Sequence, residues 1–245
     1  MSAADPFSLK LTFFGENMQK YILDRRLLAA ASFVPEGAIL ADIGSDHAYL
    51  PIHLSQAGRI QRALASDIND GPVDAARKNI ISYGVCDKVT AQKSDGLDGV
   101  ESFLPDCITI LGMGGELIVR IIDRAPWVRN KKIRLILQPM THGEILSRYL
   151  CEQGFEIVDE TIVCDGERDD RIYRILVAEF DGIRRELTEA EHYVGGLNLV
   201  RQPNGAQMYI KRLVYMLETR RQGRLLGGLD CSAEDKLIEE LEKYL

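Results

Sequence analysis

Acidic side chains lie near the ends of two segments that are typical of buried strands. Asp42 lies just before Gly44 in the apolar run 38–44, and Asp67 lies near the end of the predicted strand 62–68. Continuous apolar runs of this length are typical of strands buried on both faces of a parallel sheet. The carboxyl ends of parallel strands meet at one edge of the sheet, so we expect these carboxylates to line one ligand site.

The loop around Gly44 carries one glycine where a dinucleotide-binding loop carries three. The missing glycines of the Gly-x-Gly-x-x-Gly pattern would admit a pyrophosphate, so the loop disfavours a dinucleotide cofactor. S-adenosyl-L-methionine (SAM) has no phosphate and needs only a tight turn at Gly44 and acceptors for its ammonium group, a role open to Asp42 or Asp46. The alternative is that both carboxylates cap the helix that should follow the loop.

Two further loops carry groups suited to a nucleoside. In nucleoside-binding α/β folds, an acid at the end of the second strand accepts hydrogen bonds from both ribose hydroxyls, and we favour this role for Asp67 over that of an ordinary loop acid. Ser94, Asp95 and Gly96 follow the predicted strand 88–94. Asp95 is a candidate acceptor for an adenine amine, although Asp-Gly is also a common turn dipeptide.

Glycines follow the predicted strand 107–113. Gly112, Met113 and Gly114 would lie at the strand end that faces the transferred methyl group when SAM is bound. Glycines there expose backbone carbonyls and leave room for a bulky base. The segment is also compatible with a simple glycine-rich turn. Gln138, at the end of the next predicted strand, is expected to form another wall of the same rim.

Tyr49, His47 and Asp46 lie around the start of the helix predicted at 49–57, and they are the candidate catalytic residues. A tyrosine in this place can stack on a base that has left its helix, while Asp46 or His47 shapes the polar edge of that base. A single tyrosine can equally pack on the edge of a sheet, and that alternative stays open.

The elements that must position these residues alternate between strand and helix. Apolar periodicity predicts a helix at 18–33 before the first strand. The predicted strands are 38–44, 62–68, 88–94, 107–113 and 132–139, and the predicted helices that follow them are 49–57, 72–84, 115–125 and 144–154. Two closing strands, 155–166 and 171–180, have no helix between them, so the last strand should enter antiparallel. This order predicts an α/β fold with a parallel sheet covered on both faces, as in class I SAM-dependent methyltransferases.

The character of the chain changes after Phe180. Residues 183–245 show helical apolar spacing and a Thr-x-x-Glu capping pattern at 188–191, which predict a small helical domain built around a hairpin of long helices. Residues 184–224 hold eight Lys/Arg and four Asp/Glu, whereas residues 225–245 hold two Lys and six acids. This asymmetry predicts a basic helical arm that contacts phosphates, with a plain solvated helix face as the alternative.

The composition is that of a globular protein with a buried core. Of 245 residues, 46% are hydrophobic and 27% are charged, which suits one large domain with a small appendage. The five cysteines form no CxxC pair, and His53 and His142 lack ligand-like neighbours, so we expect neither disulfides nor a metal. No apolar run suits a membrane span or an export signal, so we expect a cytoplasmic protein. The net charge of −7 does not exclude RNA binding, because phosphates respond to local patches.

Several segments together resemble the bacterial TrmK family. They are RRLLAAASFVPEGAILADIGSDHAYLP (25–51), NDGPVDAARKNI (69–80), ITILGMGGELI (108–118) and LILQP (135–139). The resemblance implies a Rossmann-like catalytic domain (18–182) and a C-terminal, coiled-coil-like helical domain (183–245) that binds tRNA. It also implies methylation of N1 of adenosine 22 in tRNA, with SAM as the donor. Residues 1–17 form an N-terminal extension longer than the family pattern, and Asp67 stands where a glutamate is also usual.

The expected chemistry needs no strong base. N1 of adenine is a neutral nucleophile and SAM carries a sulfonium, so catalysis can rest mainly on positioning and desolvation. N1 is engaged in pairing within a duplex, so the target base must be exposed or extruded. Three alternatives stay open: a methyltransferase acting on another RNA, a protein or a small molecule; a dehydrogenase; and an RNA-binding module without catalysis.

Overall fold

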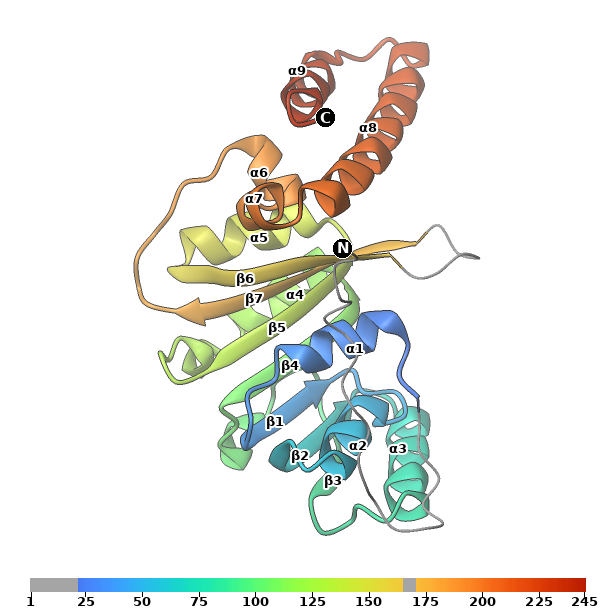
Figure 1. The fold of residues 1–245 in the computed structure, drawn as a ribbon, viewed down its shortest axis with the longest axis vertical. Coiled ribbons are helices and arrows are strands. Elements are labelled where there is room, and N and C mark those ends of the chain that lie inside the picture. The colour runs from blue at the N-terminus through green and yellow to red at the C-terminus, as the bar shows by residue number, and fades with distance from the viewer. Residues whose placement is uncertain (1–21, 165–170) are drawn as a thin grey trace, which may run out of the picture.

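The computed structural model describes residues 22–164 and 171–245, and a seven-stranded sheet forms the centre of this described part (Figure 1). The strands are β1 (Ala38–Ile43), β2 (Ile60–Asp67), β3 (Val89–Lys93), β4 (Cys107–Gly114), β5 (Arg134–Thr141), β6 (Phe155–Cys164) and β7 (Ile172–Phe180). Their order across the sheet is β3-β2-β1-β4-β5-β7-β6. The strands β1 to β5 run parallel, and β7 pairs antiparallel with β5 and β6. The predicted parallel sheet with an antiparallel closing strand is confirmed.

Helices cover both faces of the sheet (Figure 1). One face carries α1 (Arg25–Ser32), α2 (Tyr49–Gln56) and α3 (Asp70–Ser82), and the other carries α4 (Gly115–Asp123), α5 (Gly143–Glu152) and the 3₁₀ helices η1 (Val100–Phe103) and η2 (Pro126–Val128). Leu40 of β1 packs in the core on the α1–α3 side, and its neighbour Ala41 packs in the core on the α4–α5 side. Successive residues of β1 thus point to opposite buried faces, which explains its continuous apolar sequence.

The first described helix begins later than predicted. Its N-cap is Asp24, which has an extended backbone and whose carboxylate accepts a hydrogen bond from the Leu27 amide at 2.7 Å. Ile22, which the spacing placed on the apolar face of a helix at 18–33, lies before this cap and is 85% exposed. The prediction is therefore wrong at Ile22, because apolar spacing does not encode the capping conformation of a single residue. Residues 18–21 of the predicted helix, like the N-terminal extension 1–17, lie outside the described part of the chain.

The chain after β7 folds into the helices α6 (Glu189–Val194), α7 (Gly196–Arg201), α8 (Pro203–Leu226) and α9 (Ser232–Glu242). The long α8 and the shorter α9 form a helical hairpin at the end of the molecule farthest from β3 (Figure 1). Leu217 of α8 and Leu241 of α9 belong to a separate apolar core. The capping box at Thr188 forms as the sequence indicates, and Cys231 takes the N-cap position of α9.

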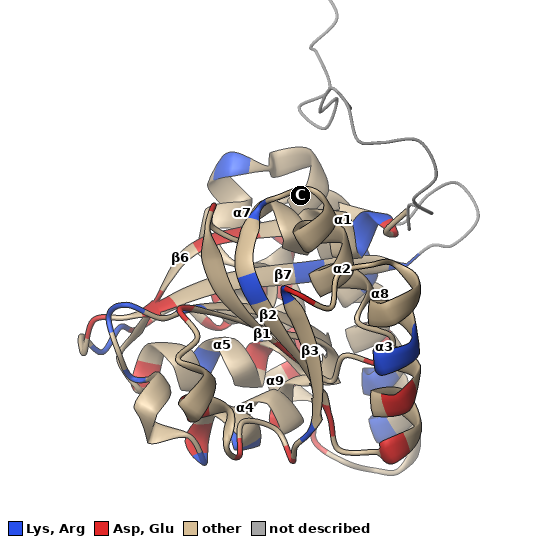
Figure 2. Cartoon of the chain, turned by 90° about the horizontal axis from the view of Figure 1, so that it is seen from below, with Lys and Arg blue, Asp and Glu red and all other residues tan. Residues whose placement is uncertain are grey.

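Charged residues of both signs mix on the side of the molecule seen in Figure 2. There α3 carries acids and bases together, and Asp74 Oδ1 lies 3.1 Å from Arg77 Nη1. The net charge of −7 is therefore not gathered into one acidic field on this side. Within residues 22–164 and 171–245, none of the helices has the length and apolar character needed to cross a membrane.

Gly115, the first residue of α4, marks a close approach of two loops at the carboxyl edge. A Cβ here would overlap the backbone carbonyl of His142, which precedes α5. We expect Gly115→Ala to lower the free energy of unfolding by about 2 kcal/mol, because backbone atoms cannot move aside easily. Gly71, in the first turn of α3 with open space around it, is the control, and Gly71→Ala should be neutral or stabilise by about 0.5 kcal/mol. Urea unfolding compares them, and equal stabilities would contradict the contact.

Candidate active site at the carboxyl edge of the sheet

The turn around Gly44 joins β1 to α2 at the carboxyl edge. Gly44 has a φ of +75°, a conformation that glycine adopts without the steric cost of a Cβ. The amides of Gly44 and Ser45 both donate to the carbonyl of Ser66 in β2, at 2.8 and 2.9 Å. These bonds fasten the turn to the neighbouring strand and hold this part of the edge in one conformation.

Asp42 lies in β1 just before this turn and is buried. Its Oδ1 accepts a hydrogen bond from the Thr109 hydroxyl of β4 at 2.6 Å. Burial raises the pKa of Asp42, while hydrogen bonds from Ser45 and Thr109 and the positive charge of Arg26 oppose that rise. Asp42 thus links β1 to β4, and its pKa depends on its burial and on these neighbouring groups.

The predicted catalytic residues Asp46, His47 and Tyr49 form one group beside the turn. His47 Nε2 lies 3.4 Å from Asp46 Oδ2, and the rings of His47 and Tyr49 stack with centroids 5.1 Å apart and planes 23° apart. The alternative in which Asp42 and Asp46 cap α2 is wrong, because Ala48 holds the N-cap position without a side-chain hydrogen bond. The structure brings these three residues together as an aromatic platform with an adjacent carboxylate.

Asp67, the last residue of β2, is held by its own loop. Its Oδ1 accepts hydrogen bonds from the backbone amide of Asn69 at 2.8 Å and from the Asn69 side chain at 3.3 Å. The Asp67 carbonyl also accepts from the Ser94 amide at 2.9 Å, which ties the loop after β3 to the end of β2. The carboxylate is therefore oriented, and its assignment to a ribose stays a prediction.

The turn after β3 uses its side chains in two ways. The Ser94 hydroxyl donates to the carbonyls of Gly96 and Asp98, at 3.1 and 2.7 Å, so it shapes the turn itself. The Asp95 carboxylate is half-exposed, and its Oδ2 lies 2.9 Å from Nη1 of Arg124 at the end of α4. Arg124 also contacts Asp98 at 2.7 Å, so one guanidinium holds both carboxylates of the turn.

Gly112, Met113 and Gly114 are the last three residues of β4, so the alternative of a simple glycine-rich turn is wrong, and Met113 lies against the Gly44 turn. Gly112 has a φ of +78°, and Gly114 is the N-cap of α4. The Met113 side chain approaches Gly44 so closely that a Cβ on Gly44 would overlap Met113 Cε. The predicted cofactor residues at the carboxyl ends of β1 and β4 therefore meet at one place.

Arg26 and Gln138 form a support whose geometry the sequence does not reveal. The buried Gln138 accepts hydrogen bonds with its Oε1 from the Gly112 amide at 3.0 Å and from Arg26 Nη1 at 2.9 Å. Its Nε2 donates to the Pro139 carbonyl at 2.9 Å. The Arg26 guanidinium also lies 5.8 Å from the ring centre of Tyr173. Gln138 was predicted as a wall of the rim, but Arg26 was missed as a cation beside Gly112.

Asp42 makes the stability of the fold depend on pH. Its pKa in the folded protein lies above the ordinary 3.8, so the folded chain binds this proton more tightly than the unfolded chain. The stability that this group contributes is full at low pH and is lost as the pH rises through the raised pKa. Asp42→Asn removes the titration and keeps an acceptor for Thr109. As the pH rises from about 4 through the raised pKa of Asp42, we expect the parent's free energy of unfolding to fall relative to the variant's. Urea unfolding tests this, and a pH-independent difference would contradict the raised pKa.

Known proteins share this fold. The chain is 36% identical over 173 residues to the tRNA (adenine(22)-N(1))-methyltransferase of Bacillus subtilis, covering 68% of this chain and 71% of that protein. The Streptococcus pneumoniae protein Sp1610, solved in complex with S-adenosyl-L-methionine, is similar with a TM-score of 0.78 and 33% identity, covering 90% of this chain and 99% of that one. TrmK of M. capricolum, solved with the cofactor product S-adenosyl-homocysteine (SAH), is similar with a TM-score of 0.74 and 26% identity, covering 91% and 98%.

The match to a family model fixes the class of the protein. Residues 23–176 match a methyltransferase domain. The order of the strands in the sheet, taken with this match, is that of a class I SAM-dependent methyltransferase. Within that class, the chain belongs to the TrmK family of tRNA (adenine(22)-N1)-methyltransferases. The predicted family and fold class are thereby confirmed.

Proposed function

We propose that this chain transfers the methyl group of SAM to N1 of adenosine 22 in tRNA, in the cytoplasm. The observation that carries the proposal is that the Gly44 turn, Asp67 at the end of β2 and Gly112 near the end of β4 meet at one edge of the sheet. The support for the substrate is 36% identity to the Bacillus subtilis enzyme named for this reaction.

The residues at the edge match the parts of SAM. Asp67, with its fixed orientation, suits the ribose hydroxyls, and Asp95 suits the adenine amine. The positive φ of Gly44 lets backbone approach the amino-acid part, whose ammonium group suits Asp42, two residues before Gly44. Arg26 lies beside Gly112 and supplies a cation for the carboxylate of the same amino-acid part.

The group around Tyr49 serves the target base. SAM supplies an electrophilic methyl group on its sulfonium, so the chain has to position N1 and exclude water rather than remove a proton first. The stacked rings of His47 and Tyr49 offer a platform for an extruded adenine, and Asp46 offers an acceptor at its polar edge. Backbone carbonyls at Gly112 and Gly114 are the proposed acceptors for the exocyclic amine.

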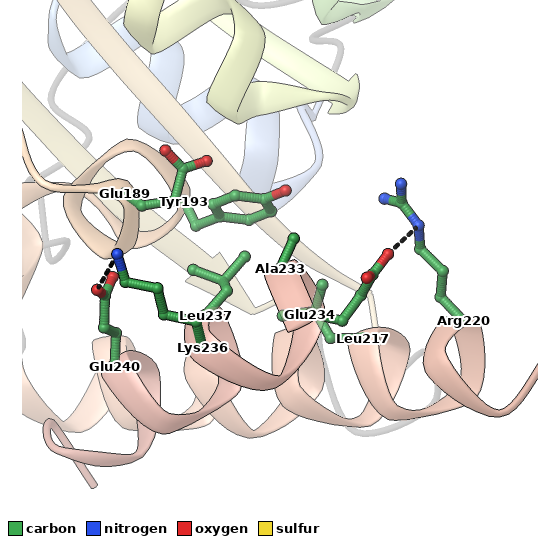
Figure 3. Close-up of a pocket in the computed structure, with 9 residues that line it drawn as sticks. All are labelled: Glu189, Tyr193, Leu217, Arg220, Ala233, Glu234, Lys236, Leu237 and Glu240. Carbon is green, nitrogen blue, oxygen red and sulfur yellow. Dashed lines mark ion pairs between the residues drawn. The ribbon is translucent and has the colours of Figure 1, made fainter. Parts of the chain in front are cut away.

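Charges of the helical hairpin pair with one another. Arg220 Nε lies 3.3 Å from Glu234 Oε1, and Arg221 pairs with Asp235, so acids of α9 neutralise part of α8. Arg220 and Glu234 also border a pocket of about 310 Å³ between α6 and the hairpin, as Figure 3 shows. The positive charge counted for residues 184–224 is thus partly neutralised within the chain, and we expect a modest number of phosphate contacts.

Binding of tRNA should weaken as salt rises, and Lys211 should contribute to that dependence. Lys211 is exposed on α8, and we expect Lys211→Gln to reduce the slope of log affinity against log salt by about one phosphate contact. The control is Lys236→Gln on α9, whose ammonium lies 4.0 Å from Glu240, and it should keep the parent's slope. Filter binding over a salt series measures both, and a parent affinity insensitive to salt would contradict an electrostatic grip on RNA.

Transfer of labelled methyl groups tests the proposed reaction class. The protein is incubated with methyl-labelled SAM and, in parallel, with tRNA, a protein mixture or small-molecule acceptors. We expect label in tRNA only, and thermal stabilisation by SAH but not by NAD. Label in the other acceptors without label in tRNA would overturn the assignment of the substrate.

A further inference from the structure

The β6–β7 hairpin holds a buried ion pair outside the cofactor edge. Arg174 of β7 donates two hydrogen bonds to Glu160 of β6, from Nε at 3.0 Å and from Nη2 at 2.9 Å, and both side chains are 1% exposed. Removing two charges from water is expensive, and apolar residues of similar volume often stabilise a fold as well or better. Stability of the hairpin therefore does not account for this pair.

Arg174 also binds the end of α6. Its Nη1 donates to the carbonyls of His192 and Tyr193, at 2.6 and 3.2 Å. These carbonyls belong to the last turn of α6, where helical carbonyls lack helical partners and a positive charge is favourable. The guanidinium thus joins the sheet to the C-terminal end of α6.

Glu160 binds the start of α7. Its Oε1 accepts from the amides of Leu197 and Asn198, at 2.9 and 3.2 Å, which belong to the first helical turn and lack helical partners. Gly195 stands between the two helices with a φ of +95°, and a Cβ there would overlap the Glu160 carboxylate. The ion pair therefore satisfies both helix ends that meet at this corner.

Gln202 is a third anchor, at the start of α8. Its Nε2 donates to Thr161 Oγ1 at 2.7 Å, and its Oε1 accepts from the Ile162 amide at 3.2 Å. Because β6 is an outer strand of the sheet, Gln202 satisfies backbone and side-chain groups along an otherwise open edge. The chain passes from α7 to α8 at this residue, so β6 holds the start of α7 through Glu160 and the base of α8 through Thr161 and Ile162.

We propose that Arg174, Glu160 and Gln202 are positioning residues that set the direction in which α8 leaves the sheet. They thereby decide where a tRNA held along α8 presents its adenosine to the cofactor edge. This inference rests on the proposed function, because it takes α8 to contact tRNA. The helix has 24 residues, about 36 Å at 1.5 Å per residue, so a small change of angle at its base displaces its far end by several ångströms.

Two variants remove the anchors. Arg174→Met combined with Glu160→Gln removes both charges and keeps an acceptor for the amides of α7. Gln202→Ala removes only the third anchor, and it is the milder change should the double variant fail to fold. The matched control is Arg148→Ala, which breaks the exposed Arg148–Glu189 pair of 2.6 Å at the start of α6 and leaves the corner intact.

A distance measurement tests the direction of α8 without RNA. Spin labels are placed on the exposed Cys86, before β3, and on Gln222→Cys in α8, with Cys164→Ser to prevent labelling there. We expect a narrow distance distribution in the parent and in the control, and a shifted or broadened distribution in both anchor variants. Unchanged distributions in folded anchor variants would overturn the proposal.

The rate of methyl transfer in a single turnover distinguishes a misplaced adenosine from a general loss of stability. We expect the anchor variants to bind SAH and tRNA within about twofold of the parent and to transfer the methyl group about tenfold more slowly, because the adenosine is misplaced. The control should match the parent in all three measurements. A parent rate of transfer in variants with an altered α8 would overturn the link to the substrate. A parent that does not methylate tRNA would overturn the proposed function, while the distances would still decide the anchor role.

Discussion

Replacing Asp67 with alanine is expected to weaken SAM binding about 100-fold while leaving the fold intact. The two hydrogen bonds from Asn69 fix the direction of the carboxylate, so the site does not have to order it when the ribose binds. Hydrogen bonds to a charged group contribute about 1.5–3 kcal/mol each, and the loss of two of them at the lower end of this range accounts for a factor of this size. Calorimetric titration with SAM measures the change.

The controls for Asp67 separate a ribose acceptor from a loop acid. Asp67→Glu keeps a carboxylate and should retain most of the affinity, because a longer acid can still reach the hydroxyls. Asp74→Ala removes an exposed acid of α3 that pairs with its helical neighbour Arg77. This variant should bind SAM as tightly as the parent does. Parent-like affinity in Asp67→Ala would refute the ribose role.

Tyr49→Ala is expected to slow methyl transfer to tRNA by about ten- to a hundredfold, with SAM affinity nearly unchanged. Stacking of a base on an aromatic ring contributes about 1–3 kcal/mol per base, and the variant loses all of it. The ring is already held in place by His47, at 5.1 Å between centroids, and by packing against the core on the α1–α3 side. Single-turnover rates at saturating SAM and tRNA measure the effect on the chemical step.

The matched variant for this position is Tyr49→Phe. It keeps the ring and should retain most of the rate if stacking is what the residue contributes. A phenylalanine variant as slow as the alanine variant would place the function in the hydroxyl and contradict the stacking role. Parent-like turnover in Tyr49→Ala would exclude Tyr49 from the site altogether.

The sheet was predictable from sequence because its strands carry a strong and local signal. The first strand, predicted at 38–44, is observed at 38–43, since a strand buried on both faces must be apolar at every position. The start of the first described helix was not predictable in the same way. There the extended backbone of the N-cap residue Asp24 starts the helix, although the residues before it also show helical apolar spacing. That start depends on the φ and ψ of a single residue.

The positions of the candidate site were predictable, but several of its contacts were not. Residues at the carboxyl ends of parallel strands must share one edge, so Gly44, Asp67 and Gly112 could be grouped from the order of elements alone. The hydrogen bond from Arg26 to Gln138 joins residues 112 positions apart, and no local pattern reports such a contact.

The charge of the C-terminal region shows a related limit of the sequence. Counting residues gives a basic segment followed by an acidic one. Folding turns α9 back along α8 and pairs Arg221 with Asp235, so charges that are separate in the sequence neutralise each other in space. A count along the chain therefore overstates the positive field that RNA would meet.

Nucleoside mass spectrometry of tRNA incubated with the protein and SAM tests the central claim most directly. We expect N1-methyladenosine to appear, at one residue per tRNA, and to be lost when adenosine 22 of the tRNA is replaced by guanosine. Formation of a different methylated nucleoside, or of N1-methyladenosine that survives this replacement, would contradict a carboxyl-edge site that presents this one base to the donor.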